Sequence, residues 1–314
     1  MSTARDSFIR RIQVFRLSVD SETVVDRSPQ EVDHNSVAQL MRNGLAIVGF
    51  AILEDFIRSR TGEVLARLES RHVGFANLPA PLQEAAVFGV VRALEYQAQI
   101  RRSDSEFELV QFLQRHGGLL ASTADTAYRI SELAYCCDKS NLGPGAIKDV
   151  LDGFLVKDCW GKIGALAGRV GLGSLRLPDA LNNAVRMRHL AAHVTTAKVE
   201  WTHLESYYMD AIGIAIGFDA LISHCLKLMM RAGPRYADEA RSIRHSDIKI
   251  RYLDKMRGSQ WREIEENAER AAHVAPSSAS LWPECMARAD RKHELLVMRD
   301  AKSIPVQWYV GGPR

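Results

Sequence analysis

The chain has 314 residues, 46% of them hydrophobic and 25% charged, as in an ordinary globular protein with ample material for a core. The formal net charge is only +3, which argues against a strongly basic protein that coats polyanions but does not exclude a local basic patch. The five cysteines include no C-x-x-C pair, and no segment of the secretory type opens the sequence. We therefore expect a cytoplasmic protein.

Apolar side chains recur at helical spacing along most of the chain, which predicts a mainly α-helical protein. The predicted helices cover residues 5–19, 36–72, 82–101, 105–116, 123–138, 146–154, 179–195 and 202–231, with a glycine-rich connector over 161–173. The second of them would span roughly 50 Å at about 1.5 Å per residue, so we expect it to be the spine of the fold.

The most apolar stretch, residues 209–230, contains Asp210, Asp219, His224 and Lys227. These polar side chains make it a poor membrane-spanning helix and a good buried helix. We therefore expect no membrane partner.

The pattern changes beyond residue 240. Apolar side chains alternate with Lys249 and Arg251 over 248–252, which predicts a strand with one basic face. A helix is predicted over 261–273, and two strands of a hairpin over 294–299 and 304–310. The expected organisation is thus an N-terminal helix and loop over 1–29, a helical domain over 30–232 and a small α/β domain over 241–314.

The most informative segment is VRMRHLAAH at 185–193, in which Arg188 and His193 are separated by four residues and the polar His189 follows Arg188. This R-x4-H pattern resembles that of the HEPN superfamily, where an Arg, usually followed by Asn, Asp or His, precedes a His inside a helical bundle. The run from MRNG at 41–44 to Glu63 also looks like the first long helix of the RiboL-PSP type of HEPN domain. The resemblance covers residues 30–232.

This resemblance implies an antiparallel helical bundle of the HEPN type with a small C-terminal α/β domain. It implies a metal-independent endoribonuclease that needs no cofactor and forms a homodimer with one composite site. Its products would be cyclic phosphates and 5′-hydroxyl ends, and its partners RNA and a possible antitoxin or defence-system protein. By analogy, its role would be that of a toxin or an antiphage effector. A tyrosine that partner enzymes modify in some HEPN toxins is replaced here by Thr195, so that route of regulation is doubtful.

The chemistry of RNA cleavage explains why such residues are suited to the task. The 2′-hydroxyl can attack the adjacent phosphate if one group takes its proton and another protonates the leaving oxygen, and an imidazole can do either near neutral pH. We assign this task to His193, and phosphate clamping to Arg188, whose guanidinium matches phosphate oxygens. His189 and Arg186 are assigned supporting or RNA-binding roles. Positions five apart lie about 140° apart around a helix, so we expect a second copy to complete the cleft.

Other interpretations stay open at this point. His189 and His193 have the spacing of two metal ligands, but the segment lacks the glutamate of the H-E-x-x-H motif, so we predict no metal site. Gly213 and Gly217 would allow close helix contact, either at a dimer seam or within the core. The chain could also be a HEPN module that binds RNA or protein without catalysis.

Overall fold

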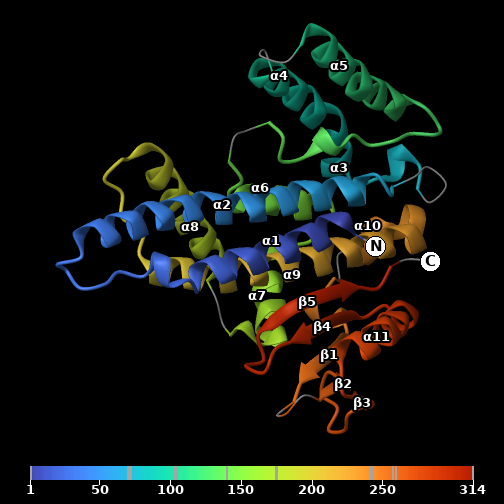
Figure 1. Cartoon of the computed structure of the whole chain (residues 1–314). Helices are drawn as coiled ribbons and strands as arrows, with labels where there is room; N and C mark the ends of the chain where they lie inside the picture. The colour runs from blue at the N-terminus through green and yellow to red at the C-terminus, as the bar shows by residue number, and fades with distance from the viewer. Residues whose placement is uncertain are drawn as a thin grey trace.

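The computed structural model describes residues 2–68, 73–101, 105–138, 141–173, 176–240, 243–256, 258 and 260–312, and most of these are helical (Figure 1). The end of the predicted helix at 69–72 and the first residues of the predicted C-terminal domain, 241–242, lie outside the described residues. The sequence-based prediction of a mainly helical chain with a small C-terminal α/β part is confirmed.

Three helices form the centre of the molecule: α1 (Thr3–Val19), α2 (Val32–Leu65) and α9 (Trp201–Ala232). α1 runs antiparallel to α2, since Ser2 near its start donates a hydrogen bond of 2.6 Å to Glu63 near the end of α2. α2 and α9 run side by side in the same direction (Figure 1). Phe8, Phe56 and Phe218 join the three helices by ring contacts in the core. The predicted spine is therefore confirmed, although it pairs with a second helix of nearly equal length.

Further helices cover α9, namely α6 (Pro144–Gly153), α7 (Cys159–Ala167) and α8 (Leu177–His193). The predicted glycine-rich connector is wrong, because α7 and a π-helical turn (Gly168–Leu172) occupy most of it. A Cβ atom added to Gly217 of α9 would lie 2.8 Å from Cγ2 of Ile163 on α7. The small residues thus allow close packing of α7 on α9 inside one protomer, which accounts for Gly217 without a dimer seam.

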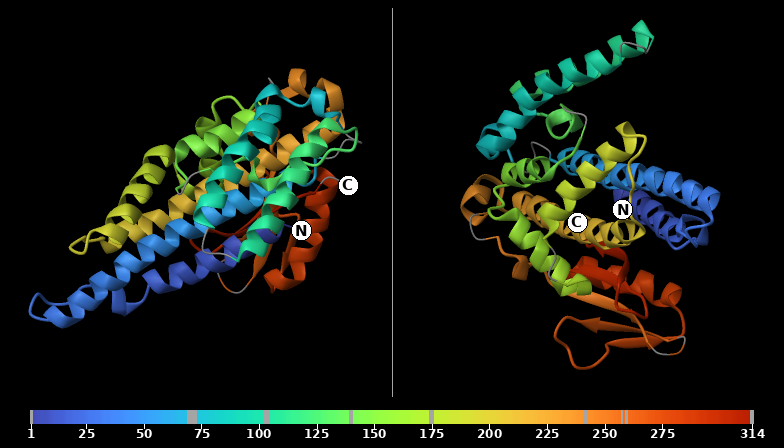
Figure 2. Two further views of the ribbon diagram at one scale, coloured as in Figure 1. Left: turned by 90° about the horizontal axis from the view of Figure 1, so that it is seen from above. Right: turned by 90° about the vertical axis from the view of Figure 1, so that its left-hand side faces the viewer.

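A helical arm lies between α2 and α6 in the sequence and consists of α3 (Ala80–Glu84), a π-helical turn (Ala85–Gly89), α4 (Val90–Ile100) and α5 (Glu106–Ala121). Figures 1 and 2 show α4 and α5 standing away from the central helices. The helix predicted over 123–138 is wrong, since only the end of the turn Ser122–Ala124 and the short turn Glu132–Ala134 are helical there. Its apolar side chains are buried from a loop instead, and Tyr128 donates a hydrogen bond of 3.0 Å to the carbonyl of Val73.

Short helical turns fill several of the connections: Glu22–Val24, Phe75–Asn77, Ser122–Ala124, Gly233–Arg235, α10 (Tyr236–Ala240) and His245–Asp247. A five-stranded sheet follows, with strands β1 (Ile250–Lys255), β2 (Trp261–Glu265), β3 (His273–Ala275), β4 (Leu295–Arg299) and β5 (Pro305–Val310), and one helix, α11 (Ser278–Lys292). The strand order is β3-β2-β1-β4-β5, with β1 and β4 parallel and the other pairs antiparallel. The predicted hairpin is confirmed as β4 and β5. The helix predicted over 261–273 is wrong, because this segment forms β2 and the start of β3.

The basic face predicted for the first strand is also wrong. Arg251 is only 1% exposed and forms ion pairs with Glu263, Glu265 and Glu294 at 2.8, 2.7 and 2.7 Å. Two of these carboxylates lie on β2 and the third, Glu294, lies just before β4, so they reach the guanidinium from both neighbouring strands. Arg251 therefore lies on a buried face of a central strand, whereas Lys249 is exposed but precedes β1.

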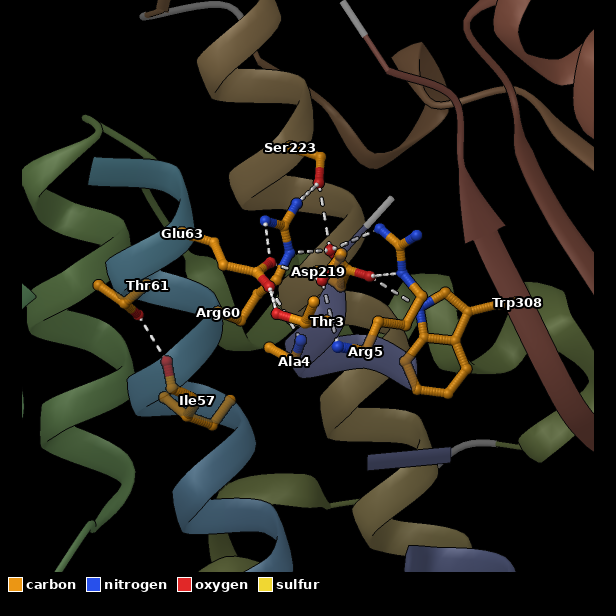
Figure 3. Close-up of polar contacts among 11 residues, drawn as sticks. Thr3, Ala4, Arg5, Ile57, Arg60, Thr61, Glu63, Asp219, Ser223 and Trp308 are labelled. Atoms are coloured by element: carbon orange, nitrogen blue, oxygen red, sulfur yellow. Dashed lines mark hydrogen bonds and ion pairs between the residues drawn. The ribbon is translucent and has the colours of Figure 1, made fainter. Parts of the chain in front are cut away.

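One face of the sheet packs on the central helices through Trp308 of β5. Its ring lies 5.8 Å from that of Phe8 and 6.2 Å from that of Phe56, and its Nε1 donates a hydrogen bond of 2.8 Å to Asp219 (Figure 3). The other face packs on α11 through a separate cluster that includes Leu253, Leu296 and Cys285. The helical core and the sheet are thus joined by apolar packing and by a buried polar cluster.

Within the described residues, two segments are long and apolar enough to cross a membrane by length and composition alone, Val32–Leu65 and Trp201–Ala240. The most apolar part of the second is 83% buried inside the protein, as expected for the central helix of a folded core. The corresponding part of the first is 39% buried, because its N-terminal half carries an exposed apolar face.

Candidate functional site

The four residues proposed for RNA cleavage all lie in the second half of α8. This helix begins after Arg176, with Pro178 in its first turn, where the missing N–H of proline costs no hydrogen bond. Asp179, where the predicted helix begins, lies within the first turn. The helix ends at His193, and Val194 takes an extended conformation. The site residues therefore precede a sharp change in chain direction.

Burial divides the four residues between two faces of α8. Arg186, His189 and His193 are exposed, whereas Arg188 is half-buried. At 3.6 residues per turn, these three exposed positions fall within about 60° of one another, and Arg188 lies about 160° from Arg186. Within one protomer, Arg186 therefore shares the face of the two histidines, and Arg188 points to another side of the helix.

The two histidines are neighbours on the surface. The rings of His189 and His193 lie 4.8 Å apart between centroids with a tilt of 52°. No hydrogen bond or ion pair joins the side chains of Arg186, Arg188, His189 or His193 to any other residue that the structure describes. Two arginines and two imidazoles are thus free to bind an anion or to exchange protons.

The chain just after His193 is held in place by two buried residues of α2. Nε of Arg42 donates a hydrogen bond of 2.8 Å to the carbonyl of Val199, and Nδ2 of Asn43 donates one of 2.9 Å to that of Ala197. Arg42 also pairs with Asp26 at 3.0 Å. Both residues belong to the MRNG segment noted in the sequence, whose role here is to anchor the end of α8 against α2.

A cavity of about 610 Å³ lies beside this helix, between α8 and α9 and over α2. Its wall includes Arg186, but Arg188 and His193 are not part of it. Asn183, His203 and Asp210 supply polar groups, and Leu190 and Tyr207 supply apolar surface. A cavity of this size with a few polar groups is typical of a site for a small molecule or a nucleobase.

Asp210 is the most perturbed acid of this cavity. Burial raises its pKa to about 6, because the surrounding protein disfavours the charged carboxylate. No hydrogen bond connects its side chain to the rest of the described chain. In the sequence, Asp210 stands out only as a polar residue in an apolar stretch, with no visible connection to the motif on α8. Asp210 lies about one turn after Tyr207 on the helix that follows the motif, and this position could have indicated that it lies near α8.

No family model, curated protein or solved structure matches this chain. The site is therefore interpreted from its own residues. Among the residues that the structure describes, no group of three or more His, Cys, Asp and Glu side chains is arranged to hold a metal ion. His189 and His193 thus lack a third ligand from the described part of the same protomer.

Proposed function

We propose that this protein is a metal-independent endoribonuclease of the HEPN type, with Arg188 and His193 as catalytic residues of a site shared by two copies of the chain. The observation that supports this proposal is the set of unpartnered guanidinium and imidazole groups on one exposed helix end. Such groups, left without structural partners, fit phosphate binding and proton transfer better than a structural role.

The proposed reaction needs no bound cofactor. The 2′-hydroxyl oxygen attacks the adjacent phosphorus, its proton passes to one imidazole, and the bond from phosphorus to the 5′-oxygen breaks. A second imidazole gives a proton to the departing 5′-oxygen, which leaves a 2′,3′-cyclic phosphate and a 5′-hydroxyl. His193 and the partner's His193 would divide these two proton transfers, while Arg188 stabilises the charge on the phosphorane. His189 and Arg186 would hold the flanking RNA.

A second copy is part of the proposal because one protomer leaves the site incomplete. Arg188 and His193 diverge on α8, and an apolar face lies next to the end of that helix. Val37, Leu40 and Met41 on α2 are 55%, 72% and 46% exposed, and they flank the residues that bind the chain after His193. Two copies joined through this face of α2 would bring their α8 ends close together.

The direct test is incubation of the purified protein with single-stranded RNA in the presence of EDTA. We expect cleavage, with 2′,3′-cyclic phosphate on one product and a 5′-hydroxyl on the other, detected by end-labelling with and without a phosphatase that opens cyclic phosphates. RNA that is bound but left intact would contradict the endoribonuclease and favour a HEPN module that binds RNA without catalysis.

The dimer has its own test. Leu40→Glu places a charge on the exposed face of α2, and we expect it to convert the dimer to a monomer in sedimentation and to abolish cleavage. The matched control is Phe88→Glu, which changes another exposed apolar side chain, 60% exposed and located in the helical arm. A Leu40→Glu protein that remains dimeric, or that cuts RNA as a monomer, would rule out this interface.

A further inference from the structure

A second and larger cavity lies at the opposite end of α9 from the motif helix. It has a volume of about 1170 Å³ and is bounded by the C-terminal half of α9, the segment 243–249 and the end of α11. Lys227 lines it and lies twenty residues after Tyr207 of the first cavity, which corresponds to roughly 30 Å along a helix. The two cavities are therefore separate sites.

This second cavity is strongly basic. Six Lys and Arg side chains line it, against three Asp and Glu side chains. Two of the acids are already occupied: Asp290 accepts hydrogen bonds of 2.8 Å from both Tyr309 and the backbone of Gly312, and Glu239 pairs with Arg231 at 2.8 Å. The third, Asp247, accepts a hydrogen bond of 2.7 Å from the backbone of Arg244. Lys292 pairs at 2.6 Å with Glu265, which lies outside the lining, so its charge is already compensated and the lining keeps an excess of two positive charges.

Lys227 is the most informative of these residues. Its side chain is half-buried, and no carboxylate in the described part of the chain lies within salt-bridge distance of it. Burial lowers the pKa of Lys227 to about 8, with only a partial offset from Asp290. A half-buried ammonium without a counter-ion is costly, and a bound anion would remove that cost.

Stabilisation of helix ends explains only some of the positive charges that line this cavity. Arg231 lies in the last turn of α9, and Arg291 and Lys292 lie in the last turn of α11, where cations stabilise the negative end of a helix. Lys227 and Lys249 lie in neither of these turns and have no such function. These two side chains approach the cavity from α9 and from the segment before β1, so a ligand held by both would bridge the helices and the sheet.

We propose that this cleft binds a multiply phosphorylated small molecule of the nucleoside polyphosphate class. Its volume is that of a pocket for a whole nucleotide and exceeds the need of a single phosphate. The excess of basic over acidic side chains matches the several negative charges of a polyphosphate chain. Leu228, Met230 and Ile243 give the cleft an apolar side against which a base could pack. The proposal does not depend on RNA cleavage.

Calorimetric titration of the full chain with ATP, ADP, AMP and inorganic phosphate tests this proposal. We expect affinity to rise with the number of phosphates and to fall by about 10- to 100-fold in Lys227→Met and in Lys249→Met, the loss of one charged hydrogen bond. Lys227→Met keeps the volume of a half-buried side chain, so we expect it to fold, as thermal unfolding will show. Lys302→Met, a change of an exposed lysine outside the cavity, should bind ATP as the wild type does.

Three results would overturn the proposal. They are the absence of ATP binding, binding of ATP that Lys227→Met and Lys249→Met leave unchanged, and binding of inorganic phosphate as tight as that of ATP. A parallel titration with a single-stranded RNA oligonucleotide separates a macromolecular occupant from a small one. If these two variants weakened RNA binding and ATP did not bind, the cleft would be an RNA surface and the nucleotide assignment would be wrong.

Discussion

Replacing His193 by alanine is expected to slow RNA cleavage by about 100- to 10,000-fold, because a positioned group that transfers protons contributes on this order. Replacing Arg188 by alanine should lower the rate by about 100- to 1,000-fold, the usual effect of removing one group that stabilises the charge of a transition state. Neither side chain has a hydrogen-bond or ion-pair partner in the described part of the chain, so both variants should keep the thermal stability of the wild type. The measurement is the rate of cleavage of a labelled oligonucleotide under single-turnover conditions.

Matched variants make this result specific. His273→Ala removes an exposed histidine on β3, and Arg270→Ala removes an exposed arginine near it, so both should cut RNA at the wild-type rate. Arg186→Ala distinguishes two arrangements of the site. In a site shared by two copies, Arg188 is the more important arginine. In a site confined to one protomer, Arg186 shares the face of the histidines, and its loss would be the more severe.

Mixing two inactive chains tests the shared site directly. A dimer that pairs an Arg188→Ala chain with a His193→Ala chain still holds one intact arginine and one intact histidine, from opposite copies. We expect such mixtures to regain part of the cleavage activity. If His193→Ala and Arg188→Ala both cut RNA as the wild type does, the catalytic assignment is wrong. If both are inactive and the mixture stays inactive, one arginine and one imidazole do not suffice, and the Leu40→Glu variant then decides whether the site is shared.

The helical spacing of apolar residues was enough to predict most of the long helices. The apolar spacing predicted the start of α2 and both ends of α9 to within a few residues. The end predicted for α2, residue 72, lies outside the described residues. The wrong predictions share a cause. In each segment the residue type favours one local structure or exposure, and contacts with distant parts of the chain favour another. Gly161 and Gly164 suggested a loop, yet they lie in α7, which packs on α9 through Ile163 against Gly217. Arg251 suggested a solvent-facing strand, yet three carboxylates from elsewhere in the chain enclose it.

The candidate site shows the same limit. The spacing of Arg186, His189 and His193 already places them on one helix face, so this part could be predicted from the sequence. The anchoring of the chain after α8 by Arg42 and Asn43 could not, because their partners lie more than 150 residues away. The same holds for both cavities, whose walls are assembled from different helices. A charged residue in an apolar stretch was the one local sign of a long-range contact, and Asp219 is the clearest example.

Replacing Asp219 by alanine is expected to destabilise the protein by about 3–5 kcal/mol, the usual cost of leaving a buried charge without its partner. Asp219 is 0% exposed and pairs with Arg5 at 2.6 Å and with Arg60 at 2.7 Å (Figure 3). Trp308 and Ser223 also donate hydrogen bonds to its carboxylate, at 2.8 and 3.2 Å. Its loss would leave the buried Arg5 without a carboxylate partner and Arg60 with Glu63 alone, and it would break the polar link between α1, α2, α9 and β5. Chemical denaturation followed by tryptophan fluorescence measures the change.

Surface pairs supply the control for this prediction. Asp55→Ala removes the partner of Arg11, and because both side chains are largely exposed, we expect less than about 1 kcal/mol. Asp219→Asn keeps the size of the side chain and can still accept from one arginine, so it should be less destabilising than Asp219→Ala. Equal effects of Asp219→Ala and Asp55→Ala would mean that the buried cluster contributes nothing beyond an ordinary surface pair.

The pH dependence of this effect follows from the sign of the pKa shift. Burial alone would raise the pKa of Asp219, but the charges of Arg5 and Arg60 outweigh it and hold the pKa well below its usual range. A group whose pKa is lowered by folding stabilises the protein above its unfolded pKa, about 3.9 for aspartate, and loses that contribution as the pH falls further. The stability difference between wild type and Asp219→Asn should therefore be constant near neutral pH and shrink below about pH 4. A difference that grew on acidification would show that the carboxylate is not held in its charged form by the two arginines.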